Sequence, residues 1–131
     1  MSRIALDGKT AVVIGGTSGI GRTMAVGLAR AGANVVATGR RAELVEEVSA
    51  EIESVGVKTI RQPTDVEARE SIQALHDAVS TRIAPTDILI NCAGRTIKSP
   101  TIDVTEDDWH AVLETNLHGT LRACQVFGRS M

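Results

Sequence analysis

The sequence predicts an α/β fold in which a doubly wound parallel β-sheet carries helices on both faces. Two observations predict this class. Short apolar runs alternate along the chain with longer segments that repeat apolar residues at helical spacing, and strands that alternate with helices of this length form βαβ units. The 131 residues suit one domain with one core, and no linker or low-complexity tract divides them.

The first half of the chain supplies two strands and two helices. Residues 9–15 are predicted to form a short buried strand, and residues 20–31 a helix with one apolar face. Gly32 ends that helix, because glycine is the residue that most easily takes the left-handed conformation of a helix end. Residues 34–39 are predicted as the second strand and residues 41–55 as an amphipathic helix.

The second half continues the alternation. Residues 57–62 are predicted as a third strand, residues 67–82 as a third helix, and residues 87–94 as a fourth strand that runs into a turn of small residues. Residues 95–104 form a long polar connection. Because this loop follows a strand, it should lie at the carboxyl end of the sheet, where ligands bind in folds of this kind.

The last helix is predicted from a capping signal at Thr105 and runs to about Gly128. Within it, Asn116 shares an apolar stripe with Leu117 and Leu121. A buried amide is therefore expected, and such a group needs hydrogen-bond partners. A structural role as a cap or kink residue is one explanation for it.

Composition excludes several classes of protein. The formal net charge of −2 and the small number of aromatic residues argue against a nucleic-acid partner. No apolar run is long enough to span a membrane, and the first residues do not resemble a signal peptide. Cys92 and Cys124 form neither a CxxC pair nor a metal-like cluster with the three histidines. They are predicted to be reduced thiols in a cytoplasmic protein without a metal site.

The glycine-rich loop between the first strand and the first helix is the clearest signal of function. Gly15, Gly19 and Gly21 have the spacing GxxxGxG. A strand–loop–helix unit directs free N–H groups and the positive end of the helix dipole towards a ligand, which suits a phosphate. The phosphate loop GxxxxGK[ST] is absent from this stretch, which argues against triphosphate hydrolysis. By itself the spacing also fits an ordinary connection between a strand and a helix.

Three motifs together resemble the short-chain dehydrogenase/reductase family. They are "IGGTSGIG" at residues 14–21, "NCAG" at residues 91–94 and "NLHGT" at residues 116–120, in the family's order and element positions. The resemblance implies a Rossmann-like sheet with strand order 3-2-1-4, and a single NAD(P)-binding domain over residues 1–131. It also implies an oxidoreductase that transfers a hydride between NADP(H) and a carbonyl or alcohol substrate of small size.

The resemblance assigns cofactor contacts to four segments of the chain. The glycine loop would wrap the pyrophosphate, the segment after the third strand would hold adenine, and the turn after the fourth strand would line the ribose and nicotinamide. The residues so assigned, apart from two arginines considered next, are Gly15, Thr17, Ser18, Gly19, Ile20, Gly21, Asp65, Val66, Asn91, Ala93 and Gly94. Asp65 also fits the N-cap of the following helix. Cys92 stands where the family has a second Asn.

Arg40 and Arg41 decide which nicotinamide cofactor is expected. In the family, an acid at the end of the second strand accepts hydrogen bonds from the adenosine ribose, whereas an arginine pairs with a 2′-phosphate. Here Gly39 occupies the place of the acid and the two arginines follow it. NADP(H) is therefore favoured over NAD(H), although two arginines could also be the basic start of a surface helix.

The catalytic half of the family's pattern lies outside the sequence. Asn116 matches the residue that orients a water in the family's proton relay, but the chain contains no Tyr and ends at Met131. The resemblance thus implies a chain truncated before the catalytic Ser and Tyr-x-x-x-Lys, inactive as a fragment and a homodimer or homotetramer at full length. The alternatives are a non-catalytic dinucleotide-binding module or sensor, and an interaction protein that reuses the fold.

Overall fold

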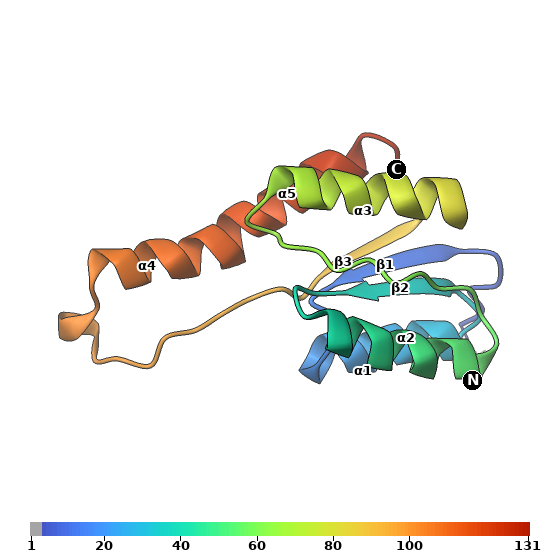
Figure 1. The fold of residues 1–131 in the computed structure, drawn as a ribbon, viewed down its shortest axis with the longest axis horizontal. Coiled ribbons are helices and arrows are strands. Elements are labelled where there is room, and N and C mark those ends of the chain that lie inside the picture. The colour runs from blue at the N-terminus through green and yellow to red at the C-terminus, as the bar shows by residue number, and fades with distance from the viewer. Residues whose placement is uncertain (1–3) are drawn as a thin grey trace.

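A computed structural model describes residues 4–131, so the first three residues of the predicted domain lie outside the described residues. The chain forms a parallel sheet with helices on both faces (Figure 1). The strands are β1 (Thr10–Ile14), β2 (Asn34–Thr38) and β3 (Ile88–Asn91), in the order β2-β1-β3. The predicted doubly wound α/β class is confirmed.

Two helices cover each face of the sheet (Figure 1). On one face lie α1 (Gly19–Arg30) and α2 (Ala42–Val55). On the other lie α3 (Arg69–Arg82) and α5 (Gly119–Gly128). These elements and the sheet together are called the body below.

The alternation of side chains along β1 divides the core between the two faces. Ala11 and Val13 belong to the cluster beneath α1 and α2, which also contains Ile52. Val12 and Ile14 point the other way, into the cluster that contains Phe127 of α5. Successive residues of a strand point to opposite faces, so a continuous apolar run is what a strand covered on both faces requires.

The predicted third strand is not formed, so the predicted order 3-2-1-4 is observed only as its 2-1-4 part. Residues 57–62 lie beside β2 as irregular chain. One main-chain hydrogen bond joins this stretch to β2, from Val35 N–H to Lys58 C=O (3.1 Å), and a second follows beyond both segments, from Thr64 N–H to Gly39 C=O (2.9 Å). Side chains at the two ends of β2 take other main-chain groups of the stretch: Asn34 Oδ1 accepts the Lys58 N–H, and Thr38 Oγ1 donates to the Gln62 carbonyl. A regular ladder therefore does not develop.

The predicted last helix is divided into three parts. Thr105 caps it as predicted, with its Oγ1 accepting the Asp108 N–H at 3.1 Å. α4 (Glu106–Leu113) is followed by a π-helical turn, η2 (Glu114–His118), and then by α5. A π-turn inserts one residue into the helix and is often found at functional sites.

Residues 95–118, called the arm below, extend away from the body (Figure 1). The arm comprises the loop after β3, a short 3₁₀ turn η1 (Thr101–Asp103), α4 and η2. Its exposed apolar side chains include Trp109 and Leu117. Among residues 4–131, no helix combines the length and the apolar character needed to cross a membrane.

Candidate functional site

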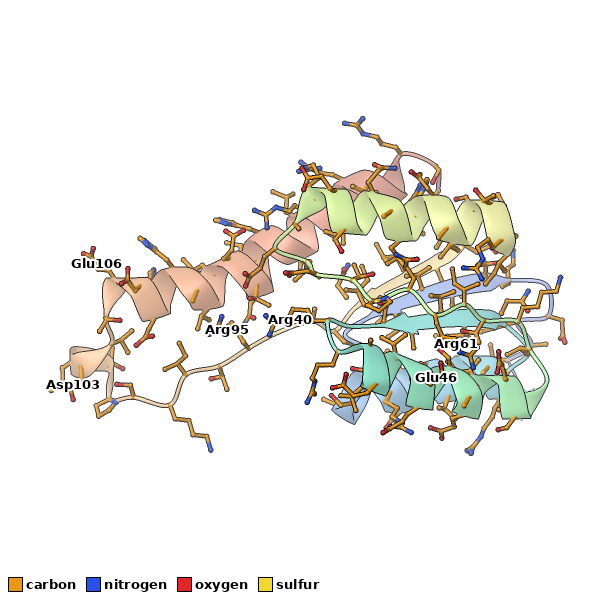
Figure 2. All side chains as sticks on the ribbon, in the orientation of Figure 1. Arg40, Glu46, Arg61, Arg95, Asp103 and Glu106 are labelled. Atoms are coloured by element: carbon orange, nitrogen blue, oxygen red, sulfur yellow. The ribbon has the colours of Figure 1, made fainter. Side chains whose placement is uncertain are left out.

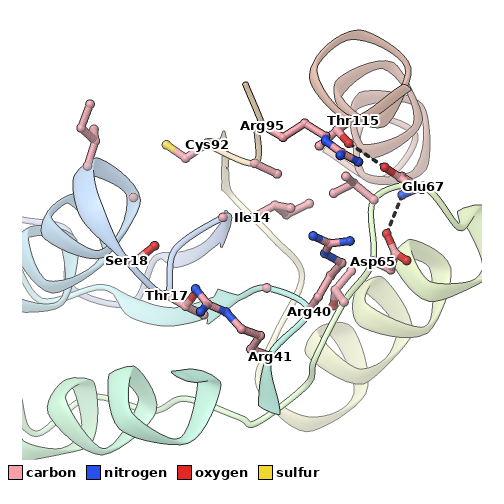
Figure 3. A pocket seen from close by; sticks show the side chains of 18 residues that line it. Ile14, Thr17, Ser18, Arg40, Arg41, Asp65, Glu67, Cys92, Arg95 and Thr115 are labelled. Carbon is pink, nitrogen blue, oxygen red and sulfur yellow. Dashed lines mark hydrogen bonds between the residues drawn. The ribbon is translucent and has the colours of Figure 1, made fainter. Parts of the chain in front are cut away.

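A cavity of about 700 Å³ lies at the carboxyl ends of the strands, beside the start of α1 (Figure 3). This volume is within the range of small-molecule binding sites. Its walls come from the loops after β1, β2 and β3, from residues 64–67, and from Thr115 of η2. The cavity therefore lies where the arm meets the body, and Arg40 and Arg95 mark that junction in Figure 2.

Most of the residues assigned to the cofactor in the sequence line this one cavity. They are Gly15, Thr17, Ser18, Ile20, Gly21, Arg40, Arg41, Asp65, Val66, Ala93 and Gly94. Two assigned residues are not among the lining residues. Gly19 lies at the first position of α1, and the Asn91 amide donates to Cys124 Sγ on α5 at 3.6 Å.

The three glycines of the GxxxGxG spacing have different structural roles. A Cβ on Gly15 would lie 2.3 Å from the Ala93 nitrogen, and one on Gly21 would lie 2.0 Å from the Gly15 oxygen. These two positions therefore let β1, the turn after β3 and α1 pack closely. Gly19 has a φ of +54°, and a Cβ at this position would have no atom within 4 Å. The lack of a side chain at Gly19 leaves the space in front of the N-terminus of α1 open. A phosphate fits such a position.

Arg40 and Arg41 enter the cavity from the end of β2 (Figure 3). Arg41 is the N-cap residue of α2, and its side chain makes no capping hydrogen bond. Among the described residues neither arginine forms an ion pair with a carboxylate. By contrast, Arg61 of the stretch 57–62 pairs with Glu46 of α2 at 2.7 Å (Figure 2). Two unpaired guanidinium groups at a cavity favour an anionic ligand.

Asp65 is held by the chain that follows it. Its Oδ1 accepts the Glu67 N–H at 2.9 Å, and its own N–H donates to Ser71 Oγ at 2.9 Å. Because α3 begins at Arg69 with Ala68 as its N-cap, the alternative of Asp65 as the N-cap of this helix is wrong. The other carboxylate oxygen of Asp65 has no hydrogen-bond partner among the described residues, and Asp65 lines the cavity.

Asn116 has the partners that its amide needs, but it is not buried as expected. The residue is exposed, and Leu117 and Leu121 beside it are 59% and 55% exposed. Its Oδ1 accepts the Arg95 N–H at 2.8 Å, and its Nδ2 donates to the Arg95 carbonyl at 2.9 Å. The apolar stripe indicated a buried face, whereas the arm extends beyond the elements that would cover it.

Several lining residues carry no motif that would have identified them. Thr115 Oγ1 donates to Glu67 Oε1 at 2.6 Å, which connects η2 with the segment after Asp65 (Figure 3). Arg95 lines the cavity immediately after Gly94. Cys92 also lines it, as a free thiol whose Sγ is 4.0 Å from the sulfur of Met24. Within residues 4–131, no group of three or more His, Cys, Asp or Glu side chains is placed to hold a metal ion.

Glu114 precedes the lining residue Thr115 and has a lowered pKa. Hydrogen bonds from His118, and then from Arg122, hold the pKa of Glu114 below its ordinary value. Glu114 belongs to η2, and its Oε1 is 2.5 Å from Arg122 of α5. This contact fixes the π-turn to the body, so the Thr115 side chain is presented to the cavity from a supported position.

Comparison with known proteins places the chain in one family of oxidoreductases. Residues 9–131 match the family described as short chain dehydrogenase. D-threitol dehydrogenase of Mycolicibacterium smegmatis is 36% identical over 126 residues, covering 96% of this chain and 48% of that protein. Gluconate 5-dehydrogenase of Gluconobacter oxydans is 35% identical over 127 residues, covering 97% and 50%.

Solved structures agree with this assignment. A putative short-chain alcohol dehydrogenase from Sinorhizobium meliloti superposes with a TM-score of 0.92 at 36% identity, over 98% of this chain and 51% of that chain. The chain thus spans about half the length of the curated relatives it matches. The fold, the cavity at the strand ends and the match over residues 9–131 together show that the chain belongs to the short-chain dehydrogenase family.

Proposed function

We propose that this chain is the cofactor-binding part of an oxidoreductase that transfers a hydride between NADP(H) and a carbonyl or alcohol group of a small molecule. One observation carries the proposal. Eleven of the thirteen residues assigned to the cofactor from sequence line the same cavity, although they come from four separate segments of the chain. A dinucleotide bound there would supply the hydride, and the protein would supply binding and orientation.

The proposed pyrophosphate position is the start of α1. The first N–H groups of a helix have no partner within the helix, and the helix dipole adds positive potential at the same place. Gly19, with its φ of +54° and open surroundings, would allow the phosphates to approach the backbone. Asn91, whose amide is directed to Cys124, would contribute to the ribose side through its main chain.

The proposed preference for NADP(H) depends on Arg40 and Arg41. Both line the cavity, and neither is neutralised by a carboxylate of the described residues. Arginine presents several N–H donors in a planar fork that matches phosphate oxygens. We assign Arg40 to the 2′-phosphate, and Arg41 to the same phosphate or to the adenine face.

Asn116 is proposed to contribute to catalysis through a water in the proton relay. Its position in a π-turn supports this role, because such turns leave main-chain groups outside the regular helical hydrogen bonds. Its side chain is used for the two hydrogen bonds to the Arg95 backbone. The water would therefore be held by the main chain of this turn.

The proposed assembly is a homodimer or homotetramer of a cytoplasmic protein. Trp109, Leu117 and Leu121 expose apolar side chains on the arm and the start of α5. Apolar side chains exposed together commonly mark protein–protein contacts. These helices would be covered by a second copy.

The test is a cofactor titration of the protein that contains this chain and of its Arg40→Ala variant. NADPH should bind more tightly than NADH, and Arg40→Ala should weaken NADPH binding about tenfold or more with little change for NADH, because a charge-assisted contact is lost. Arg82→Ala, an exposed arginine at the end of α3, is the matched control. Equal losses for both cofactors would contradict the assignment of Arg40. Tight binding without turnover of any carbonyl or alcohol would favour the non-catalytic module.

A further inference from the structure

We propose that Arg95 is a third cofactor-binding arginine, which contacts the phosphorylated adenosine end of the dinucleotide from the wall opposite Arg40. This inference rests on the proposed function and extends it to a residue outside the three motifs. Four observations support it: the placement of Arg95, the way its backbone is held, the charges around the cavity, and the identity of the facing wall.

Arg95 lies at the point where the arm leaves the body. It follows the turn after β3 and lines the cavity. Figure 3 shows its side chain extending towards Thr115 and Glu67, while Arg40 enters the same space from the end of β2. Two guanidinium groups on separate segments thus face one part of the cavity.

Both main-chain polar groups of Arg95, its N–H and its C=O, are hydrogen-bonded. The Asn116 amide accepts the Arg95 N–H at 2.8 Å and donates to the Arg95 carbonyl at 2.9 Å. A side-chain amide that satisfies both groups of one residue fixes that residue's position more closely than either bond alone. Asn116 therefore holds Arg95 at the cavity edge, although the surrounding loop is exposed.

The charges around the cavity leave Arg95 available to an anion. Among the described residues Arg95 forms no ion pair. Each of the two lining carboxylates accepts a local hydrogen bond at one oxygen, Asp65 from the Glu67 N–H and Glu67 from the Thr115 hydroxyl. Three lining arginines against two lining carboxylates leave a net positive cavity, and a positive cavity concentrates anionic ligands.

The facing wall indicates which part of the ligand Arg95 meets. Glu67 and Thr115, towards which Arg95 extends, adjoin Asp65 and Val66. These last two residues are the proposed adenine contacts. The start of α1 supplies its own N–H groups to the pyrophosphate, so the unpaired charge of Arg95 serves the adenosine end.

The experiment compares Arg95→Gln with Lys98→Gln in the protein that contains this chain. Lys98 is an exposed cation three residues later in the same loop and does not line the cavity. Binding of NADPH and of adenosine 2′,5′-bisphosphate is measured by calorimetric titration. Arg95→Gln should weaken both ligands about tenfold, because a hydrogen-bonded charge is lost, and Lys98→Gln should change neither.

The outcomes separate this inference from the proposed function. If Arg40→Ala weakens NADPH binding and Arg95→Gln does not, only the role of Arg95 is overturned. A loss for NADPH without a loss for the bisphosphate also overturns it, because Arg95 would then act away from the adenosine end. If the unaltered protein binds neither ligand, the cavity is not a dinucleotide site and both proposals fail. The melting temperature of Arg95→Gln should match that of the unaltered protein, which excludes misfolding as the cause.

Discussion

β1 and β3 are neighbouring strands of one sheet, yet their surroundings differ. Every residue of β1 is buried, whereas all four residues of β3 are only partly covered. The difference continues along the chain, because no residue from 91 to 118 is buried, and the structure describes all of them. The body is therefore stabilised mainly by apolar burial, and the arm is attached mainly by polar contacts.

This difference matters for the cavity, which has one wall on each region. The glycine loop and the end of β2 belong to the body and are fixed by close packing. Arg95 and Thr115 belong to the arm. Arg95 donates one main-chain hydrogen bond to the Asn116 amide and accepts another from it, and Thr115 donates to Glu67. Exposed hydrogen bonds contribute about 1 kcal/mol or less each. We infer that ligand binding adjusts the arm wall more readily than the body wall.

The largest expected effect tests the contrast in burial. Phe127→Ala removes the largest fully buried side chain, whose ring packs edge-on against His76 at 5.2 Å. It should lower the free energy of unfolding by about 3–5 kcal/mol. Trp109→Ala removes a side chain of the arm that is 58% exposed. This change should lower the free energy of unfolding by about 0.5 kcal/mol or less. Urea unfolding of both variants measures the difference.

The same pair of variants can also overturn the contrast. If Trp109→Ala costs as much as Phe127→Ala, then Trp109 is covered in solution, and the arm is stabilised by burial against another surface. Sedimentation of the unaltered protein would then show whether that surface is a second copy. A dimer that dissociates on Trp109→Ala would support the proposed assembly.

A smaller effect is expected from alanine at two glycines of the loop. Gly15→Ala would force a Cβ to within 2.3 Å of the Ala93 nitrogen at a φ of +79°, and it should destabilise the protein by about 3 kcal/mol. Gly19→Ala meets no atom, so only the strain of its positive φ remains, about 1 kcal/mol. Thermal melting and NADPH titration of both variants measure the effects.

NADPH binding should separate the effect on the fold from the effect on the phosphate position. Gly19→Ala should fold nearly normally but bind NADPH poorly, since its Cβ occupies the proposed approach of the phosphates. Gly15→Ala alters two lining residues, because its Cβ displaces Ala93, so it should lose NADPH affinity together with stability. If Gly19→Ala binds NADPH normally, the open space at the start of α1 is not a phosphate site.

Local patterns in the sequence predicted most helices and strands of both regions. The continuous apolar runs at β1 and β2 predicted buried parallel strands, and Thr105 predicted the helix start at which its hydroxyl accepts the Asp108 N–H. The stretch 57–62 has a strand-like composition but is not a strand. Its pairing with β2 depends on register and on competing side-chain partners, which composition does not encode.

The site was predictable only where a motif marks it. Glu67 and Thr115 are 48 residues apart in sequence and meet through one hydrogen bond, which no local pattern predicts. The stripe around Asn116 predicted a buried amide, because apolar spacing indicates a face to be covered without indicating what covers it. In this chain the face is exposed, and the Asn116 amide is satisfied by the Arg95 backbone instead.

The smallest expected effect concerns acid stability and uses one carboxylate from each region. The main-chain N–H of Thr10, at 2.9 Å, lowers the pKa of Asp87 at the start of β3, and Lys9 adds to this effect. A pKa that is lower in the folded protein means stabilisation that is complete above the unfolded value of about 3.9. It is lost as the pH falls through the folded pKa. Asp87→Asn should therefore reduce the acid-induced loss of stability, measured by urea unfolding at pH values from 7 to 3.

Glu114→Gln is the matched variant of the arm. Hydrogen bonds from His118 and Arg122 lower the pKa of Glu114, so the sign of its contribution is the same and it too is lost in acid. Glu114→Gln should act on a different part of the molecule from Asp87→Asn. Glu114 attaches η2 to α5, whereas Asp87 connects the start of β3 with β1. We expect Glu114→Gln to speed amide exchange in η2 while leaving the global unfolding curve almost unchanged. If it shifts that curve as much as Asp87→Asn does, the arm unfolds together with the body, and the two regions form one cooperative unit.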